Sequence, residues 1–146
     1  MLELIQLCES ADEMVLNIEL KGPNDPAFKP RYDFEAASRI VYEMILETGI
    51  ATKVMLSSFQ PEILSSMKAV SADNRQFMIH RLTSDKGEPD PYDYQMHDST
   101  EGINMYHPYV SKAVTQKIRD QGGFVGVWWS AKVQTENKEM YDLVMS

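Results

Sequence analysis

The feature of this sequence that most constrains its fold is a regular alternation of short apolar runs with amphipathic segments. The apolar runs have strand length and lie at residues 14–20, 53–59, 76–80, 103–106 and 124–129. Segments with helical spacing lie at 33–48, 61–70, 111–121 and 135–145, and residues 2–8 are a plausible helix end. This order predicts a mostly parallel sheet flanked by helices. Right-handed connections wind such units into an open sheet or a barrel, and the pattern alone does not choose between them.

The clearest helix is predicted over residues 33–48. Its apolar residues recur at helical spacing on one face: Phe34, Ala37, Val41, Met44 and Ile45. Asp33 can cap its start and Gly49 can end it. Pro61 suits the first turn of the next helix, because the N–H that proline lacks would be unpaired there. Ser111 and Thr135 are the candidate caps of the last two helices.

Two stretches rich in proline and glycine interrupt this alternation. They lie at residues 22–32 and 83–102. Proline and glycine at this density break regular structure, so both stretches are predicted to be long loops. Long loops in compact domains are often functional.

Length and charge set the class of protein. The chain has 146 residues, the size of one domain, and a net charge of −8 from 22 acidic and 14 basic residues. This balance disfavours a nucleic-acid partner; it fits either simple solubility or a cation site. There is no run of eighteen apolar residues and no basic secretory n-region. The only cysteine is Cys8, which fits a reducing compartment, so we expect a cytoplasmic protein.

Three strings in order resemble one known family. They are LNIELK at 16–21, VMLSSFQPEIL at 54–64 and INMYHPYVSKAVTQKIRDQGGFVGVWW at 103–129, and they resemble strings of the glycerophosphodiester phosphodiesterases. The family folds as a TIM barrel. The resemblance therefore implies that residues 1–146 form one incomplete α/β domain, a partial TIM barrel of about five parallel strands. The alternative is a flavodoxin-like open sheet unrelated to phosphodiesters.

Other strings of that family do not occur here. Its early His-Arg-Gly strand, its Glu-x-Asp strand and its histidine-aspartate turn would lie upstream of Met1. Its last strand, of the Gly-Val-Asp-Gly type, would follow Ser146. Most of the family's catalytic residues belong to those segments, so no catalytic residue is assigned and the isolated chain is expected to have little or no diesterase activity. Whether Met1 is the native start is left open.

The resemblance implies roles for five residues. Glu19, near the end of an apolar strand, matches a glutamate that binds the divalent metal, and the alternative is an ion pair with Lys21. Lys21 matches a lysine beside the phosphate. Trp128 matches a tryptophan that packs on the glycerol moiety, although it could simply fill the core. Phe59 and Asn104 match positions that line the site.

The three histidines do not match the family's catalytic pair. His80 is placed at the end of a predicted strand, His97 in the acidic loop, where it is expected to be solvated, and His107 after INMY. The family's tryptophan is usually followed by threonine, an apolar residue and asparagine. Trp129, Ser130 and Ala131 stand there instead.

Two hypotheses about function follow. In the first, the chain is part of an enzyme that uses a divalent metal, Mg²⁺ or Ca²⁺, to hydrolyse glycerophosphodiesters, small-molecule phosphodiesters, to glycerol 3-phosphate and an alcohol. In the second, a truncated barrel binds a phosphorylated ligand without turnover. It could also associate through its open edges with a second copy or a complementing chain. The alcohol and the choice of metal are left open.

Overall fold

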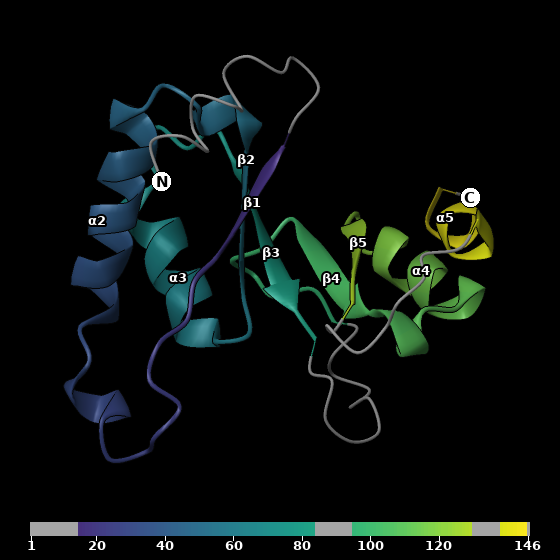
Figure 1. Cartoon of the computed structure of the whole chain (residues 1–146), viewed down its shortest axis with the longest axis horizontal. Coiled ribbons are helices and arrows are strands. Elements are labelled where there is room, and N and C mark those ends of the chain that lie inside the picture. The colour runs from purple at the N-terminus through teal and green to yellow at the C-terminus, as the bar shows by residue number, and fades with distance from the viewer. Residues whose placement is uncertain (1–14, 84–94, 130–137, 146) are drawn as a thin grey trace.

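In a computed structural model, the chain is described over residues 15–83, 95–129 and 138–145. Five parallel strands make one sheet in sequence order: β1 (Leu16–Glu19), β2 (Val54–Ser58), β3 (Met78–Leu82), β4 (Gly102–Tyr106) and β5 (Phe124–Trp128). The sheet and its helices form a half-barrel (Figure 1). The predicted partial TIM barrel of about five parallel strands is confirmed.

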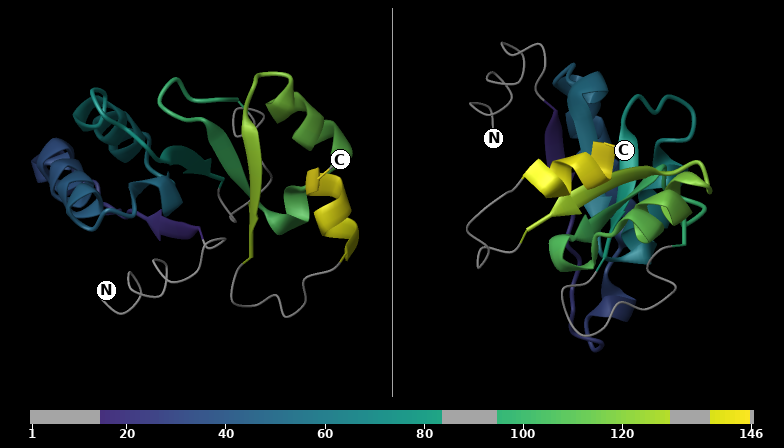
Figure 2. Two further views of the ribbon diagram at one scale, coloured as in Figure 1. Left: turned by 90° about the horizontal axis from the view of Figure 1, so that it is seen from above. Right: turned by 90° about the vertical axis from the view of Figure 1, so that its right-hand side faces the viewer.

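The described α-helices are α2 (Phe34–Glu47), α3 (Pro61–Val70), α4 (Lys112–Arg119) and α5 (Lys138–Met145). Three of them, α2, α3 and α4, connect consecutive strands, and α5 follows β5. Figure 2 shows α2 and α3 at the end of the sheet that holds β1, and α4 and α5 at the end that holds β5. Within the described ranges, no helix is long and apolar enough to cross a membrane.

Several boundaries differ from the predictions by one or two residues. The strand predicted at 76–80 is β3, at 78–82, so His80 lies in mid-strand and not at a strand end. Pairing begins only where Met78 lies beside Met55 of β2, and the apolar pattern does not encode that register. The helix end at 2–8, the cap at Thr135 and most of the loop at 83–102 lie outside the described residues.

The two faces of the sheet differ in polarity because side chains alternate along each strand. The face toward the helices is apolar, and its residues form two cores, one around Leu56 and Ile79 and the other around Ile103 and Met105. The opposite face is more polar and carries Asn17, Glu19, Ser57, His80 and Asn104. The register places Glu19, Ser57, His80, Gly102 and Phe124 side by side across the five strands.

Helix α2 begins and ends as predicted, but one of its apolar residues is not covered. The Asp33 carboxylate accepts a hydrogen bond from the Ala36 N–H at 2.9 Å, and Gly49 has a φ of 70° just after the helix. Met44, predicted to face the core, is 39% exposed. It lines an apolar groove of about 260 Å³ between α2 and β1, which is an edge strand of the described sheet.

Glu101, just before β4, forms hydrogen bonds to residues at the beginning of β3 and just before it. Its two carboxylate oxygens accept hydrogen bonds from both terminal nitrogens of Arg75, at 3.0 and 2.5 Å. One of them also accepts the backbone N–H of Ile79 at 2.8 Å. A bidentate, partly buried arginine–carboxylate pair is stronger than an exposed pair and holds its geometry better.

We therefore predict that Glu101→Gln lowers the free energy of unfolding by about 1 to 2 kcal/mol, because an amide cannot accept two hydrogen bonds from Arg75 and one from Ile79. Urea denaturation measures this change. Glu35→Gln is the matched control, since Glu35 pairs with Arg39 on the exposed surface of α2. Glu35→Gln should lower the free energy of unfolding by less than about 0.5 kcal/mol. Equal losses in the two variants would contradict this role of Glu101.

Candidate functional site

A cleft of about 430 Å³ lies on the polar face, toward the carboxyl ends of the strands. Parallel barrels build their sites at this end. Its walls come from β1, β2, β3 and β5 or from the residues that directly follow these strands. The lining residues are Asn17, Glu19, Lys21, Phe59, Leu82, Trp128 and Trp129. The cleft thus brings together Glu19, Lys21, Phe59 and Trp128, four of the five residues singled out from the sequence.

Glu19 and Lys21 form the charged wall of the cleft. The Lys21 Nζ lies 3.3 Å from a Glu19 carboxylate oxygen, and the two side chains are 73% and 31% exposed. This is the ion pair considered as the alternative role of Glu19. The Glu19 carboxylate is partly exposed, because β1 is an edge strand of the described sheet and leaves that side open to solvent.

Gln60 fixes the backbone just after Lys21. Its side-chain oxygen accepts the Gly22 N–H at 2.7 Å, and its side-chain nitrogen donates to the Pro23 carbonyl at 3.2 Å. A side chain at Gly22 would collide with Gln60 and Phe34. Gln60 was not predicted as a site residue, because its position before the proline that opens α3 carries no sign of this contact.

Trp128 is the centre of the aromatic wall. Its ring packs edge-to-face against the Phe59 ring, with 5.5 Å between the ring centroids. It also packs against the tilted ring of Tyr106, with 4.7 Å between the ring centroids. Its indole N–H donates to the Thr83 carbonyl at 3.2 Å. Three strand intervals of about 4.8 Å each separate β2 from β5 along the sheet, so a contact between Phe59 and Trp128 requires the sheet to curve.

Trp129 also lines the cleft, although it was not predicted as a site residue and stands where the family usually has threonine. It lies just beyond the end of β5, where the alternation of the strand no longer decides its direction. Its ring stacks on His107, with 6.3 Å between centroids and 26° between planes. Both tryptophans of the chain therefore lie in one cleft.

Asn104 does not line the cleft. It is buried, and its side-chain oxygen lies 2.8 Å from Nδ1 of His80. The two side chains lie over glycines of neighbouring strands. A Cβ at Gly102 would come within 2.6 Å of the His80 ring, and one at Gly126 would overlap the Asn104 amide. This pair was missed because it depends on three strands being in register.

His80 is held as a neutral imidazole in this environment. Burial lowers the pKa of His80, and the hydrogen bond to Asn104 and the charge of Glu101 oppose this shift only in part. Because the Asn104 oxygen accepts, Nδ1 donates and Nε2 carries the lone pair. Nε2 is buried and has no hydrogen-bond partner among the described residues.

The described residues fit only part of a metal site. They contain no group of three histidine, cysteine, aspartate or glutamate side chains that could hold a metal ion. In the cleft, Glu19 offers one carboxylate, while the Asn17 oxygen already accepts the Ser57 hydroxyl at 2.9 Å. Mg²⁺ and Ca²⁺ take six or more oxygen ligands, so a divalent cation at Glu19 needs ligands from outside the described residues.

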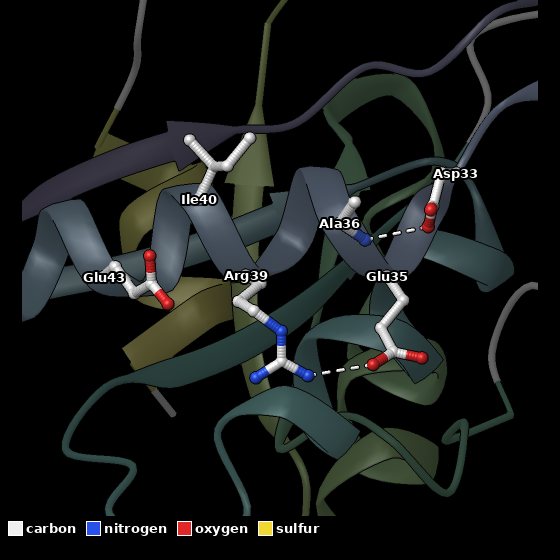
Figure 3. Close-up of a pocket in the computed structure, with 6 residues that line it drawn as sticks. All are labelled: Asp33, Glu35, Ala36, Arg39, Ile40 and Glu43. Atoms are coloured by element: carbon white, nitrogen blue, oxygen red, sulfur yellow. Dashed lines mark hydrogen bonds and ion pairs between the residues drawn. The ribbon is translucent and has the colours of Figure 1, made fainter.

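A second hollow, of about 400 Å³, lies along α2 (Figure 3). Figure 3 shows that its polar groups serve the helix itself: Asp33 caps the N-terminus, and Arg39 pairs with Glu35 at 2.8 Å. Ala36, Ile40 and Glu43 complete the lining. The hollow contains none of the five site residues predicted from the sequence, and contacts within the helix account for the charges of Asp33, Glu35 and Arg39.

Comparison with known proteins gives matches only at the level of structure. No protein-family model matches the sequence, and no curated protein matches it. A solved structure from Galdieria sulphuraria, assigned as a glycerophosphodiester phosphodiesterase, is similar over 96% of this chain and 53% of its own, with a TM-score of 0.73 and 20% identity.

Two further structures give the same result. A glycerophosphodiester phosphodiesterase from Parabacteroides distasonis is similar over 96% of this chain and 54% of its own, with a TM-score of 0.67 and 13% identity. A structure from Silicibacter pomeroyi, assigned as a glycerophosphoryl diester phosphodiesterase, is similar over 94% of this chain and 46% of its own. Its TM-score is 0.67 and its sequence identity is 17%. This chain thus has the fold of about half of each of these proteins.

The lowered pKa of His80 predicts acid sensitivity. A histidine in the unfolded chain has a pKa of about 6.5. Below that pH the unfolded state binds a proton, whereas His80 in the folded state stays neutral until the pH reaches its lowered pKa. Stability is therefore lost as the pH falls from about 6.5 toward the folded pKa, by at most about 1.4 kcal/mol per pH unit from this group. Urea unfolding between pH 7 and 5 should show a shallower loss for His80→Gln than for wild type.

The wild-type chain, measured in the same series of buffers, is the control for this experiment. An unchanged slope for His80→Gln would show that His80 does not resist protonation in the folded state.

Proposed function

We propose that the cleft is part of the substrate site of a metal-dependent glycerophosphodiester phosphodiesterase, an enzyme of glycerophospholipid breakdown. The observation that carries this proposal is that Glu19, Lys21, Phe59 and Trp128 line one cleft at the carboxyl ends of the strands. The whole protein would hydrolyse a glycerophosphodiester to glycerol 3-phosphate and an alcohol. This chain spans about half of the solved structures that it resembles, so we expect the chain alone to bind without turnover.

Lys21 is suited to bind the phosphate. Its ammonium group is largely exposed and held only by a partly exposed ion pair, so it can turn toward an anion in the cleft. An ammonium group offers three donors and a full positive charge, which stabilises the negative charge of a phosphodiester and of its transition state.

Phe59 and Trp128 are suited to hold the glycerol moiety. Their edge-to-face contact fixes both rings, and the hydrogen bond from Trp128 to the Thr83 carbonyl satisfies its indole N–H. A fixed apolar wall can pack on the carbon atoms of glycerol while the hydroxyl groups point elsewhere.

Glu19 would supply one ligand to a divalent cation, Mg²⁺ or Ca²⁺, that neutralises charge on the phosphate. Carboxylate oxygen is the ligand type that both cations prefer. The other ligands would come from outside the described residues, and binding of the cation would compete with the ion pair to Lys21.

A second candidate function is ligand binding without catalysis. Its support is that no histidine lines the cleft in the part of the chain that the structure describes. Diester hydrolysis needs a group that takes up a proton and a group that returns one, and a single Glu19 cannot serve as both a metal ligand and these groups.

Tryptophan fluorescence can test binding directly, because both tryptophans of the chain lie in the cleft. Titration with glycerol 3-phosphate should give a saturable change. Lys21→Gln should weaken binding about tenfold, which corresponds to the loss of about 1.4 kcal/mol for one partly exposed ionic contact. Lys112→Gln, at an exposed lysine that begins α4, is the matched control and should bind as wild type does.

Hydrolysis of glycerophosphocholine with Mg²⁺, with Ca²⁺ and with EDTA separates the two candidate functions. We expect no turnover by this chain alone. Metal-dependent turnover that Glu19→Ala abolishes would show that the chain contains acid and base groups that we have not found. Failure of glycerol 3-phosphate to change the fluorescence, or an equal affinity of Lys21→Gln, would contradict the proposed site.

A further inference from the structure

The described sheet has two unpaired edges. β1 pairs only with β2, and β5 pairs only with β4. The Leu20 N–H donates to Ser57 of β2, and the Phe124 N–H donates to Glu101 next to β4. Because backbone groups alternate in direction along a strand, the N–H groups of Val15 next to β1 and of Val127 in β5 point outward from the sheet. Such rows of unpaired backbone groups are templates for pairing with another chain.

Large apolar side chains lie exposed at these edges and on the open face. Val15 is 61% exposed beside β1, and Phe124 is 59% exposed at the start of β5. Met78 and Phe59, on the face away from the helices, are 38% and 39% exposed. A second copy that packs over this face and these edges would remove apolar surface of these side chains from water.

The solved barrels suggest how much polypeptide would cover this surface. This chain accounts for 53%, 54% and 46% of the three similar proteins. A second copy therefore brings about as much chain as one of those barrels contains beyond the matched part.

We propose that the polypeptide of residues 1–146 by itself forms a dimer in which two half-barrels close on each other, with β1 of each copy joined to β5 of the other. A two-fold axis parallel to the strands keeps every strand direction, so both new pairings are parallel, like the four pairings within the sheet. The two identical contacts, here called seams, leave no open edge, and closure of the ring places Met78 and Phe124 on its inner side. Ten strands make a wider ring than eight, and large inward side chains help to fill it.

Charge opposes this association at low ionic strength. Each copy carries a formal net charge of −8, so two copies repel each other at long range. In 0.1 M salt, repulsion between exposed charges more than about 10 Å apart is largely screened. Salt does not weaken the burial of apolar side chains. The dimer should therefore become more stable as the NaCl concentration rises.

Sedimentation velocity of two proline variants tests the seams. Val15→Pro removes an outward N–H beside β1, and Val127→Pro removes one from β5, while the N–H groups that pair with β2 and β4 remain. Each variant alone has both seams blocked and should sediment as a monomer. Lys112→Pro, at the first position of α4 where proline is tolerated, is the control and should remain a dimer.

Mixing the two variants gives the decisive result. In a dimer of one Val15→Pro copy and one Val127→Pro copy, one seam joins the blocked β1 to the blocked β5. The other seam joins the intact β1 to the intact β5. We therefore expect dimers in the mixture, and none in either variant alone. Far-ultraviolet circular dichroism and thermal unfolding verify that each variant is folded before it is scored. Val15→Lys and Val127→Lys provide a second pair that keeps the backbone N–H groups and places charge at each edge.

Several outcomes would overturn the proposal. One is a wild-type chain that stays monomeric at every concentration and salt level. Another is a Val127→Pro variant that still dimerises, which would indicate pairing of β1 with β1. A mixture of Val15→Pro and Val127→Pro that stays monomeric would also contradict the proposed dimer. A monomer that binds only the part of the Galdieria sulphuraria barrel that this chain does not match would indicate a complementing chain instead.

Discussion

The parallel register of the five strands determines nearly every other feature of this structure. Side chains alternate along each strand, so register decides which of them meet. In the observed register, Leu56, Ile79 and Ile103 face the helices and are fully buried. A slip of one residue in a strand would place these residues on the open face and bring polar side chains into the core. The burial of apolar surface against the helices, at roughly 25 cal/mol per Å², stabilises the observed register.

The same register places chemical groups on the open face. It puts Glu19, Ser57 and His80 on neighbouring strands at one level, and it brings Phe59 and Trp128 into contact across the curved sheet. The position of β1 at the edge then explains why Glu19 and Lys21 are accessible. A half-barrel thus presents a cleft with a charged wall and an aromatic wall, although it contains about half of the polypeptide of the solved barrels that share its fold.

Local signals in the sequence predicted the elements well. Asp33 and Ser111 accept the backbone N–H groups of Ala36 and Val114, as expected of helix caps, and these contacts involve residues only three positions apart. The Glu19–Lys21 pair was also foreseen as an alternative, because residues two apart on a strand share a face. By contrast, the exposure of Met44 depends on which strand lies at the sheet edge, and helical spacing cannot reveal this.

Contacts between distant strands explain what the sequence could not provide. The pairing of His80 with Asn104 needs glycine at residues 102 and 126, so four positions on three strands must coincide. Gln60 reaches back to the backbone after Lys21 across 38 residues of chain. Trp129 lies beyond the end of β5, where alternation stops predicting direction. In each case the missing information is the relative placement of elements, which periodicity within one element does not contain.

The most direct test of this account is a measurement of the strand register in solution. In a labelled sample, nuclear Overhauser effects between backbone protons of adjacent strands report which residues lie side by side. The parallel register predicts cross-strand effects that join Ser57 to His80, His80 to Gly102 and Gly102 to Phe124. Effects displaced by one residue, or antiparallel patterns, would contradict it, because His80, Asn104 and the cleft residues would then lie on different faces.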